Sequence, residues 1–232
     1  MNTSTETTST DFTNAVDNWQ ETYVQQENDE LSLTAAIKAL KGLSTEEAFG
    51  YVVEAVMHDA MKVLEDGVKI KSAELNISTV LSGIVTNITN DLNGIKASNT
   101  NTGTPATTSN RSQWSNAALA QDLVTQCGDL STALASPSAS WVNPITGKTE
   151  TKNWIDSGTL NTMTTALGAF TKLIGASDPS GQTVMNNVLN WTSNPTGKGK
   201  TTGQQNIQSL NSNLPTGDAS TGGLSQMASN VA

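Results

Sequence analysis

The sequence predicts a mainly α-helical protein, a helical hairpin or bundle with flexible polar loops and disordered termini. Apolar residues recur every three or four positions over several segments, which is the spacing of one helix face. Ser44 is followed three residues later by Glu47, a capping box that starts a helix. Hydrophobic residues make up only 35% of the chain, and the Thr-, Ser-, Asn- and Gly-rich segments between the helices cannot offset the entropy cost of ordering.

The N-terminal segment 1–28 is polar except for a short apolar stripe. Phe12, Trp19 and Tyr23 follow one another at helical spacing, which predicts a short amphipathic helix over about residues 10–26 within a flexible segment. Exposed aromatic side chains need a partner, either the body of the protein or another chain. We therefore treat these three aromatic residues as candidates for an interaction face.

Segment 29–96 has the clearest helical pattern and predicts a helical hairpin or one long coiled-coil-like helix. A short first helix ends at Gly42, a residue suited to the position after a helix. Gly67 either divides the following run into two helices or lies inside a continuous one. The apolar positions of that run are Val53, Met57, Ala60, Leu64 and Val68, with Leu75 continuing the series.

A seven-residue repeat completes this segment. Its apolar positions, which alternate steps of four and three residues, are Leu81, Val85, Ile88, Leu92 and Ile95. Such a face serves either self-assembly and partner binding or the intramolecular core of the hairpin. Core packing is the commoner role for an apolar stripe.

The second half of the chain predicts shorter helices with tryptophan-bearing loops. Segment 97–112 is of low complexity and predicts a flexible linker or a variable loop. A second helical region occupies 113–214, and the Gly-, Ser- and Thr-rich tail 215–232 is predicted to be disordered. Alternating residues near 141–154 predict a small β-hairpin. The expected helices cover about 114–134, 157–174, 181–191 and 204–214.

The segment NPITGKTE, at Asn143–Glu150, ends like a phosphate-binding loop but lacks its first glycine. That loop requires a glycine five residues before Gly147, and Val142 stands there. A near copy at Asn194–Thr201 has the same defect. Asn-Pro followed by Thr-Gly is typical of a turn, so the sequence predicts two turns, each shortly after a tryptophan.

The chain contains few of the residue types that catalysis or metal binding commonly uses. His58 and Cys127 are the only histidine and cysteine, which excludes paired Glu-x-x-His di-iron motifs and the usual zinc sets. Cys127 has no oxyanion-hole signature nearby, and Gly-x-Ser-x-Gly is absent. The sequence therefore predicts no catalytic, cofactor-binding or metal-binding residue and favours a non-enzymatic protein. An enzyme with a dispersed active site stays an alternative.

Charge and hydropathy limit the partners. The formal net charge of −9 disfavours nucleic-acid binding, and no apolar run approaches the length of a membrane span. The N-terminus has neither the basic nor the apolar region of a cleaved signal peptide. Its Ser- and Thr-rich composition resembles the leaders of type III secretion substrates, so we expect a secreted protein without a cleaved signal. A cytoplasmic location is the alternative.

In organisation, the chain resembles the secreted filament, needle-tip and translocator-type proteins of bacterial type III secretion systems. The shared features are the leader, the acidic composition, the scarcity of cysteine and the helices that flank a variable polar region. The resemblance implies a structural or interaction protein, linked to virulence, that acts through helix–helix association. It implies self-association, other secreted proteins or a secretion chaperone as partners. A secreted effector and a phage or virion structural protein are the alternatives.

Overall fold

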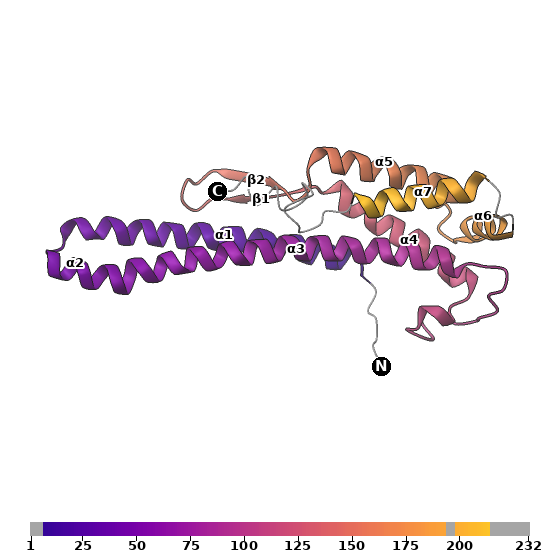
Figure 1. The fold of residues 1–232 in the computed structure, drawn as a ribbon, viewed down its shortest axis with the longest axis horizontal. Coiled ribbons are helices and arrows are strands. Elements are labelled where there is room, and N and C mark those ends of the chain that lie inside the picture. The colour runs from indigo at the N-terminus through magenta and orange to yellow at the C-terminus, as the bar shows by residue number, and fades with distance from the viewer. Residues whose placement is uncertain (1–6, 194–197, 214–232) are drawn as a thin grey trace.

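The computed structural model describes residues 7–193 and 198–213, and the fold is mainly α-helical with one small β-hairpin. A long helical hairpin runs the length of the molecule, and the second half of the chain covers one end of it (Figure 1). The predictions for the beginning of the leader, for the turn at 194–197 and for the tail 215–232 lie outside the described residues. No helix within the described part is long and apolar enough to cross a membrane.

The hairpin begins with one long helix, α1 (Ser9–Ala39), where the sequence had suggested two short ones. Neither glycine nor proline interrupts this stretch, so the two apolar patterns join into one helix. Thr8 caps its start: its amide donates to the Asp11 carboxylate over 2.8 Å, and its hydroxyl accepts from the Asp11 amide over 3.4 Å. The hairpin therefore starts near residue 9 and not at residue 29.

The chain reverses at η1 (Leu40–Gly42), a single 3₁₀ turn. The predicted capping box is confirmed, because the Ser44 amide donates to Glu47 over 3.0 Å and α2 (Thr45–Tyr51) follows. A π-helical turn, η2 (Val52–Val56), leads directly into α3 (Met57–Gly94). Gly67 lies inside α3, so the second helix is continuous and returns alongside α1 (Figure 1).

The second half contains η3 (Arg111–Gln113), α4 (Asn116–Ala135), α5 (Ser157–Ile174), α6 (Gln182–Ser193) and α7 (Lys198–Ser212). Strands β1 (Ser138–Val142) and β2 (Thr149–Asn153) form the predicted antiparallel β-hairpin, with Trp141 opposite Glu150. Helix α7 begins about six residues earlier than the sequence pattern suggested. The β-hairpin lies along the middle of the helical hairpin (Figure 1).

One hydrophobic core joins both halves of the chain. It contains the aromatic stripe of α1 and most of the seven-residue repeat of α3. Both sets had been candidates for an interaction face, and in this fold they pack inside the molecule, which is the intramolecular alternative. The buried members are Phe12, Trp19, Tyr23, Leu81, Val85, Ile88 and Ile95, and Leu92 is partly buried against them.

Segment 97–112 is a hydrogen-bonded loop, which fits the loop alternative and not the flexible linker. The Gly103 amide donates to the Gln113 carbonyl over 3.1 Å, and the Ser115 amide donates to the Gly103 carbonyl over 2.8 Å. The Trp114 indole donates to the Thr108 carbonyl over 2.8 Å. These bonds give part of the loop's backbone its partners within the protein.

Candidate functional site

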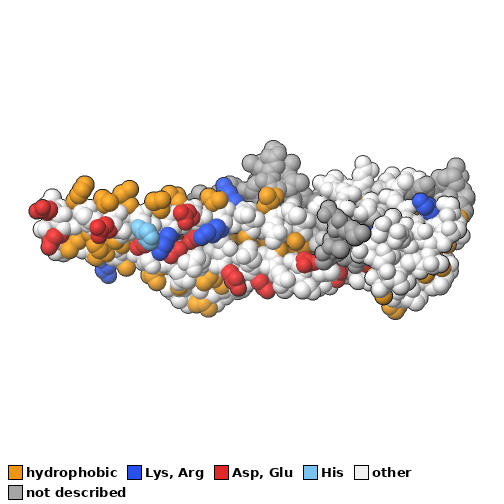
Figure 2. Space-filling model, turned by 90° about the horizontal axis from the view of Figure 1, so that it is seen from below, with side chains coloured by type: hydrophobic (Ala, Val, Ile, Leu, Met, Phe, Trp, Pro, Cys, Tyr) orange, Lys and Arg blue, Asp and Glu red, His pale blue; other side chains and the backbone are white. Residues whose placement is uncertain are grey.

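The end of the helical hairpin that extends beyond the second half of the chain carries most of the exposed apolar surface. We call this end, residues 29–75, the arm. Among the described residues, twelve large hydrophobic side chains are exposed, and all but Val142 and Ile145 of the β-hairpin lie in the arm. Figure 2 shows hydrophobic side chains distributed along it. The ten are Leu31, Ile37, Leu43, Phe49, Val53, Met57, Met61, Leu64, Val68 and Leu75.

Seven of these side chains form one line, which we call the α3 stripe: Phe49, Val53, Met57, Met61, Leu64, Val68 and Leu75. At about 100° per residue, its members within α3 fall within roughly 40° of a common direction. The first two continue the line because the π-helical turn of η2 contains more residues per turn than an α-helix, which keeps four-residue steps aligned. Leu64 and Phe49 are the most exposed, at 73% and 75%.

The opposite side of the same helix is buried against α1. Ile70, Ala73 and Ile77 lie on that side, where α1 and α3 make their long contact. The first half of α3 therefore has two apolar faces, and the fold covers only one of them. A helix on the surface of a soluble protein normally has one apolar face and one polar face. The α3 stripe is therefore the part of the surface most suited to binding a partner.

The sequence pattern contained most of this stripe, at Val53, Met57, Leu64, Val68 and Leu75, but only as the sign of a helix. Ala60, the remaining member of that series, is only partly exposed. The predicted interaction face was the more regular repeat that begins at Leu81, and the fold buries that repeat. The feature that distinguishes the two series is contact with the second half of the chain, and that contact is not local in sequence.

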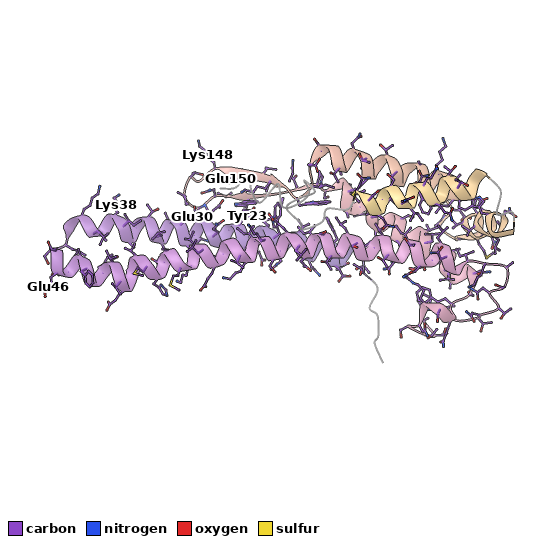
Figure 3. The ribbon with its side chains drawn as sticks, in the orientation of Figure 1. Tyr23, Glu30, Lys38, Glu46, Lys148 and Glu150 are labelled. Atoms are coloured by element: carbon purple, nitrogen blue, oxygen red, sulfur yellow. The ribbon has the colours of Figure 1, made fainter. Side chains whose placement is uncertain are left out.

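The β-hairpin is attached to the base of the arm by a buried polar cluster. The Trp141 indole donates to Glu27 over 2.9 Å, and the Tyr23 hydroxyl donates to Glu74 over 3.4 Å. The rings of Tyr23 and Trp141 stack at 5.3 Å, and the Lys152 ammonium lies 4.1 Å from the Tyr23 ring centre. Figure 3 shows Tyr23 on α1 beneath the β-hairpin. These contacts hold the β-hairpin against the base of the arm.

Burial changes the acidity of this cluster. It raises the pKa of the Glu74 carboxyl, and the hydrogen bond from Tyr23 opposes that shift in part. It also raises the pKa of Glu27, against the hydrogen bond from Trp141. Burial lowers the pKa of the Lys152 ammonium, while the surrounding glutamates, Glu150 first, oppose that change. Both buried carboxyls are therefore easier to protonate in the folded protein than in the unfolded chain.

Replacing Glu74 with glutamine is expected to stabilise the protein at neutral pH and to make its stability less dependent on pH. In the wild type, the folded state keeps the Glu74 proton to a higher pH than the unfolded state does. The free energy of unfolding therefore falls as pH rises from the pKa of Glu74 in the unfolded chain through its raised pKa in the folded protein. Urea unfolding at a series of pH values from about 4 to about 7.5 follows stability as pH rises from the ordinary glutamate pKa. The exposed Glu46 at the arm tip, changed to glutamine, is the control (Figure 3). An unchanged pH slope in E74Q would contradict this account.

A second buried cluster fastens the loop before α4 to both neighbouring helices. The Arg111 Nε lies 3.2 Å from the Asp91 carboxylate, and another guanidinium nitrogen donates to Asp122. A third donates to the Asn87 side chain over 2.9 Å. The guanidinium also lies 5.2 Å from the Trp114 ring centre. We call this set the Arg111 clamp; its partners include side chains of both α3 and α4.

The turn at Asn143–Lys148 is confirmed and has no phosphate cradle. The Asn143 side-chain oxygen accepts from the amides of Ile145 and Thr146 over 2.8 and 3.0 Å, so these donors already have partners. Gly147 has φ +68°, the positive value that the turn requires. The related turn at Asn194 lies outside the described residues.

Cys127 and His58 are too far apart to act together. Burial, helped by the charge of Asp91, raises the Cys127 pKa to about 12, so the thiol stays protonated at neutral pH. His58 is exposed and lies 3.3 Å from Asp59. It precedes Asp91 on the same helix by 33 residues, which corresponds to about 50 Å. No group of histidine, cysteine and carboxylate side chains in the described part could hold a metal ion.

The polar cavity beside the end of α3 is lined mainly by amide and hydroxyl side chains. It measures about 530 Å³, and its lining includes Asn90, Asn93 and Asn99. Lys96 and Arg111 are its charged lining residues, and none of the lining residues is a histidine, a cysteine or a carboxylate.

Comparisons with protein families, curated proteins and solved structures give no match for this chain. The α3 stripe is thus the candidate functional site on geometric grounds alone.

Proposed function

We propose that this chain is a non-enzymatic interaction protein that acts through helix–helix association, with the α3 stripe as its associating surface. The observation that carries the proposal is the pair of apolar faces on one helix, of which the fold buries only one. An amphipathic helix presented on a projecting arm suits association with another helix, whose ridges would fit between the side chains of the stripe.

The size of the stripe fits an association surface. Burying a large apolar side chain contributes roughly 1.5–3 kcal/mol, so the seven half-exposed members offer on the order of 10 kcal/mol before costs. Association itself costs about 4–15 kcal/mol in lost freedom of motion. The two quantities are comparable, and stable binding therefore needs most of the stripe. Removing a few members should abolish it.

Changing Met61, Leu64 and Val68 together to glutamine is expected to abolish concentration-dependent association while the helix content stays unchanged. All three side chains are more than half exposed, and glutamine is a good helix former, so folding should tolerate the changes. Light scattering over a concentration series, with negative-stain imaging, measures the association. The control changes the exposed Val142 and Ile145 of the β-hairpin to glutamine. If the triple variant associated as strongly as the β-hairpin control variant, the proposal would be contradicted.

The proposal extends to the setting in which the arm acts. We propose a secreted structural component of a bacterium, of the filament, needle-tip or translocation-associated kind. The Ser- and Thr-rich start and the projecting arm support this. Its partners would be other copies, other secreted proteins or a secretion chaperone.

Export is best tested by transfer and not by deletion. Phe12 and Trp19 lie in the core, so removing the first twenty residues would unfold the protein and confuse the result. Residues 1–20 fused to a reporter, expressed in a bacterium with a type III secretion system, are expected to carry the reporter out of the cell. Retention of the fusion alongside export of a known substrate would count against the secretion route.

A further inference from the structure

We infer that a cavity between the end of α3 and the helices α6 and α7 binds a small aromatic carboxylate. These elements lie at the end of the molecule away from the arm tip (Figure 1), so the inference does not depend on the α3 stripe. The cavity measures about 240 Å³. An apolar cavity of about 150 Å³ can hold a benzene molecule. The volume therefore leaves room for one aromatic ring and its carboxylate.

One side of the cavity is an apolar wall. Val188 and Trp191 are three residues apart on α6, so their side chains share a helix face, and Leu92 contributes from the last turn of α3. Val188 is buried, whereas Leu92 and Trp191 are partly exposed. A flat aromatic ring can stack on the Trp191 indole and contact both aliphatic side chains. A neutral sugar fits this wall less well, because its hydroxyl groups would face Leu92 and Val188 without hydrogen-bond partners.

The other side of the cavity is polar and carries one charge. Lys96 is the charged lining residue, and the amide side chains of Asn93 and Gln204 complete the polar lining. All three side chains are exposed, and none makes a hydrogen bond or ion pair with the part of the chain that the structure describes. An ammonium and two amides offer the donors that bind a carboxylate. In a protein with a net charge of −9, this is a locally cationic site.

The fold fixes the backbone from which the Lys96 side chain extends. The Lys96 amide donates to the Asn116 side chain over 3.2 Å, and the Lys96 carbonyl accepts from the same side chain over 3.0 Å. Asn116 begins α4, so this pair of hydrogen bonds ties the chain after α3 to the next helix. Lys96 and Asn93 also line the larger polar cavity beside the end of α3. They stand where the two cavities meet, at the polar edge of the apolar wall.

An NMR titration of the full chain with benzoate tests the class of ligand. Neutral benzamide is expected to bind about fivefold more weakly than benzoate, because it does not form an ion pair with Lys96. Lys96→Gln removes the charge, so it should weaken benzoate binding about fivefold and leave benzamide binding unchanged. The control is Lys41→Gln, which changes an exposed lysine in the turn of the helical hairpin. Circular dichroism checks the fold of each variant.

Filling the cavity gives a readout that does not involve charge. Gly203 of α7 lines the cavity, and a Cβ added there would lie 3.3 Å from the Trp191 ring. Gly203→Ala is expected to weaken benzoate and benzamide alike, about tenfold, because the methyl group competes for the face of the ring. Alanine is the better helix former, so the helix content should not fall. The matched control is Gly168→Ala on α5, where an added Cβ would meet open space.

Several results would overturn this inference. Benzoate could fail to bind, or bind no better than benzamide. Unchanged benzoate binding in K96Q or G203A would place the ligand elsewhere. Glucuronate that bound more tightly than benzoate would show that the site selects a sugar acid and not an aromatic one. None of these results bears on the proposed function, because the titrations do not involve association through the α3 stripe.

Discussion

Replacing Arg111 with alanine is expected to lower the free energy of unfolding by about 3–5 kcal/mol, the usual cost of breaking a buried ion pair. The Asp91 side chain is fully buried and that of Asp122 nearly so, and Arg111 is the cation that contacts both. Without it, two carboxylates lie beside each other in a medium of low polarity. The clamp joins α3, α4 and the loop between them, so its loss should destabilise the packing of the second half of the chain on α3.

Chemical denaturation of R111A measures this loss. The matched control is Lys172→Ala, an exposed cation on α5. Arg111→Lys should fall between the two, because it keeps the charge but its compact ammonium lacks the planar fork that reaches Asp91, Asp122 and Asn87 together. If R111A differed from K172A by no more than about 0.5 kcal/mol, the usual range of surface substitutions, the clamp would not be a stabilising element.

The helical hairpin could be predicted because its signals are local. Apolar spacing and the capping box at Ser44 act within one or two helical turns, and the structure confirms both. The predicted extent of α1 was wrong, because the apolar pattern of residues 10–26 and that of the segment before Gly42 predicted two separate helices, whereas the structure has one. The burial of Phe12 against Trp154, which lies far away in sequence, could not be inferred from spacing alone.

The loop 97–112 shows how composition can mislead. Its asparagines and threonines predicted a flexible linker, yet the same side chains make its hydrogen bonds. Asn99 donates to the Trp114 carbonyl over 3.1 Å, and Asn101 donates to the Ser112 carbonyl over 2.7 Å. Short polar side chains satisfy backbone groups in irregular structure as readily as they tolerate disorder. The composition alone does not separate the two cases.

The candidate site illustrates a different limit. Two apolar series follow one another along η2 and α3, one from Val53 to Leu75 and one from Leu81 to Ile95, the residue just after α3. Periodicity identifies both, but it does not say which one the rest of the chain covers. The more regular repeat is the one buried, because it lies where the second half of the chain packs on α3. The exposed series lies beyond the reach of that second half.

Replacing Trp154 with alanine is expected to cost about 3–5 kcal/mol of folding free energy, as for other large aromatic residues in a core. The side chain is fully buried, and its ring meets Phe12 edge-on at 5.0 Å. Its indole donates to the Ser136 carbonyl over 2.6 Å. Trp154 thus joins the start of α1 to the connection between the β-hairpin and α5. Trp154→Phe keeps the ring contact but leaves that carbonyl without its donor, so an intermediate loss of about 1–3 kcal/mol is expected.

The control for Trp154→Ala is Phe49→Ala, a large aromatic residue removed from the arm. Phe49 is 75% exposed, so its loss should change the folding free energy by no more than about 0.5 kcal/mol. It should nevertheless weaken association, because Phe49 belongs to the α3 stripe. Denaturation curves and sedimentation on the same two variants therefore separate the core from the surface. If F49A destabilised the fold as much as W154A, the stripe would be part of the core. That result would contradict association through the α3 stripe.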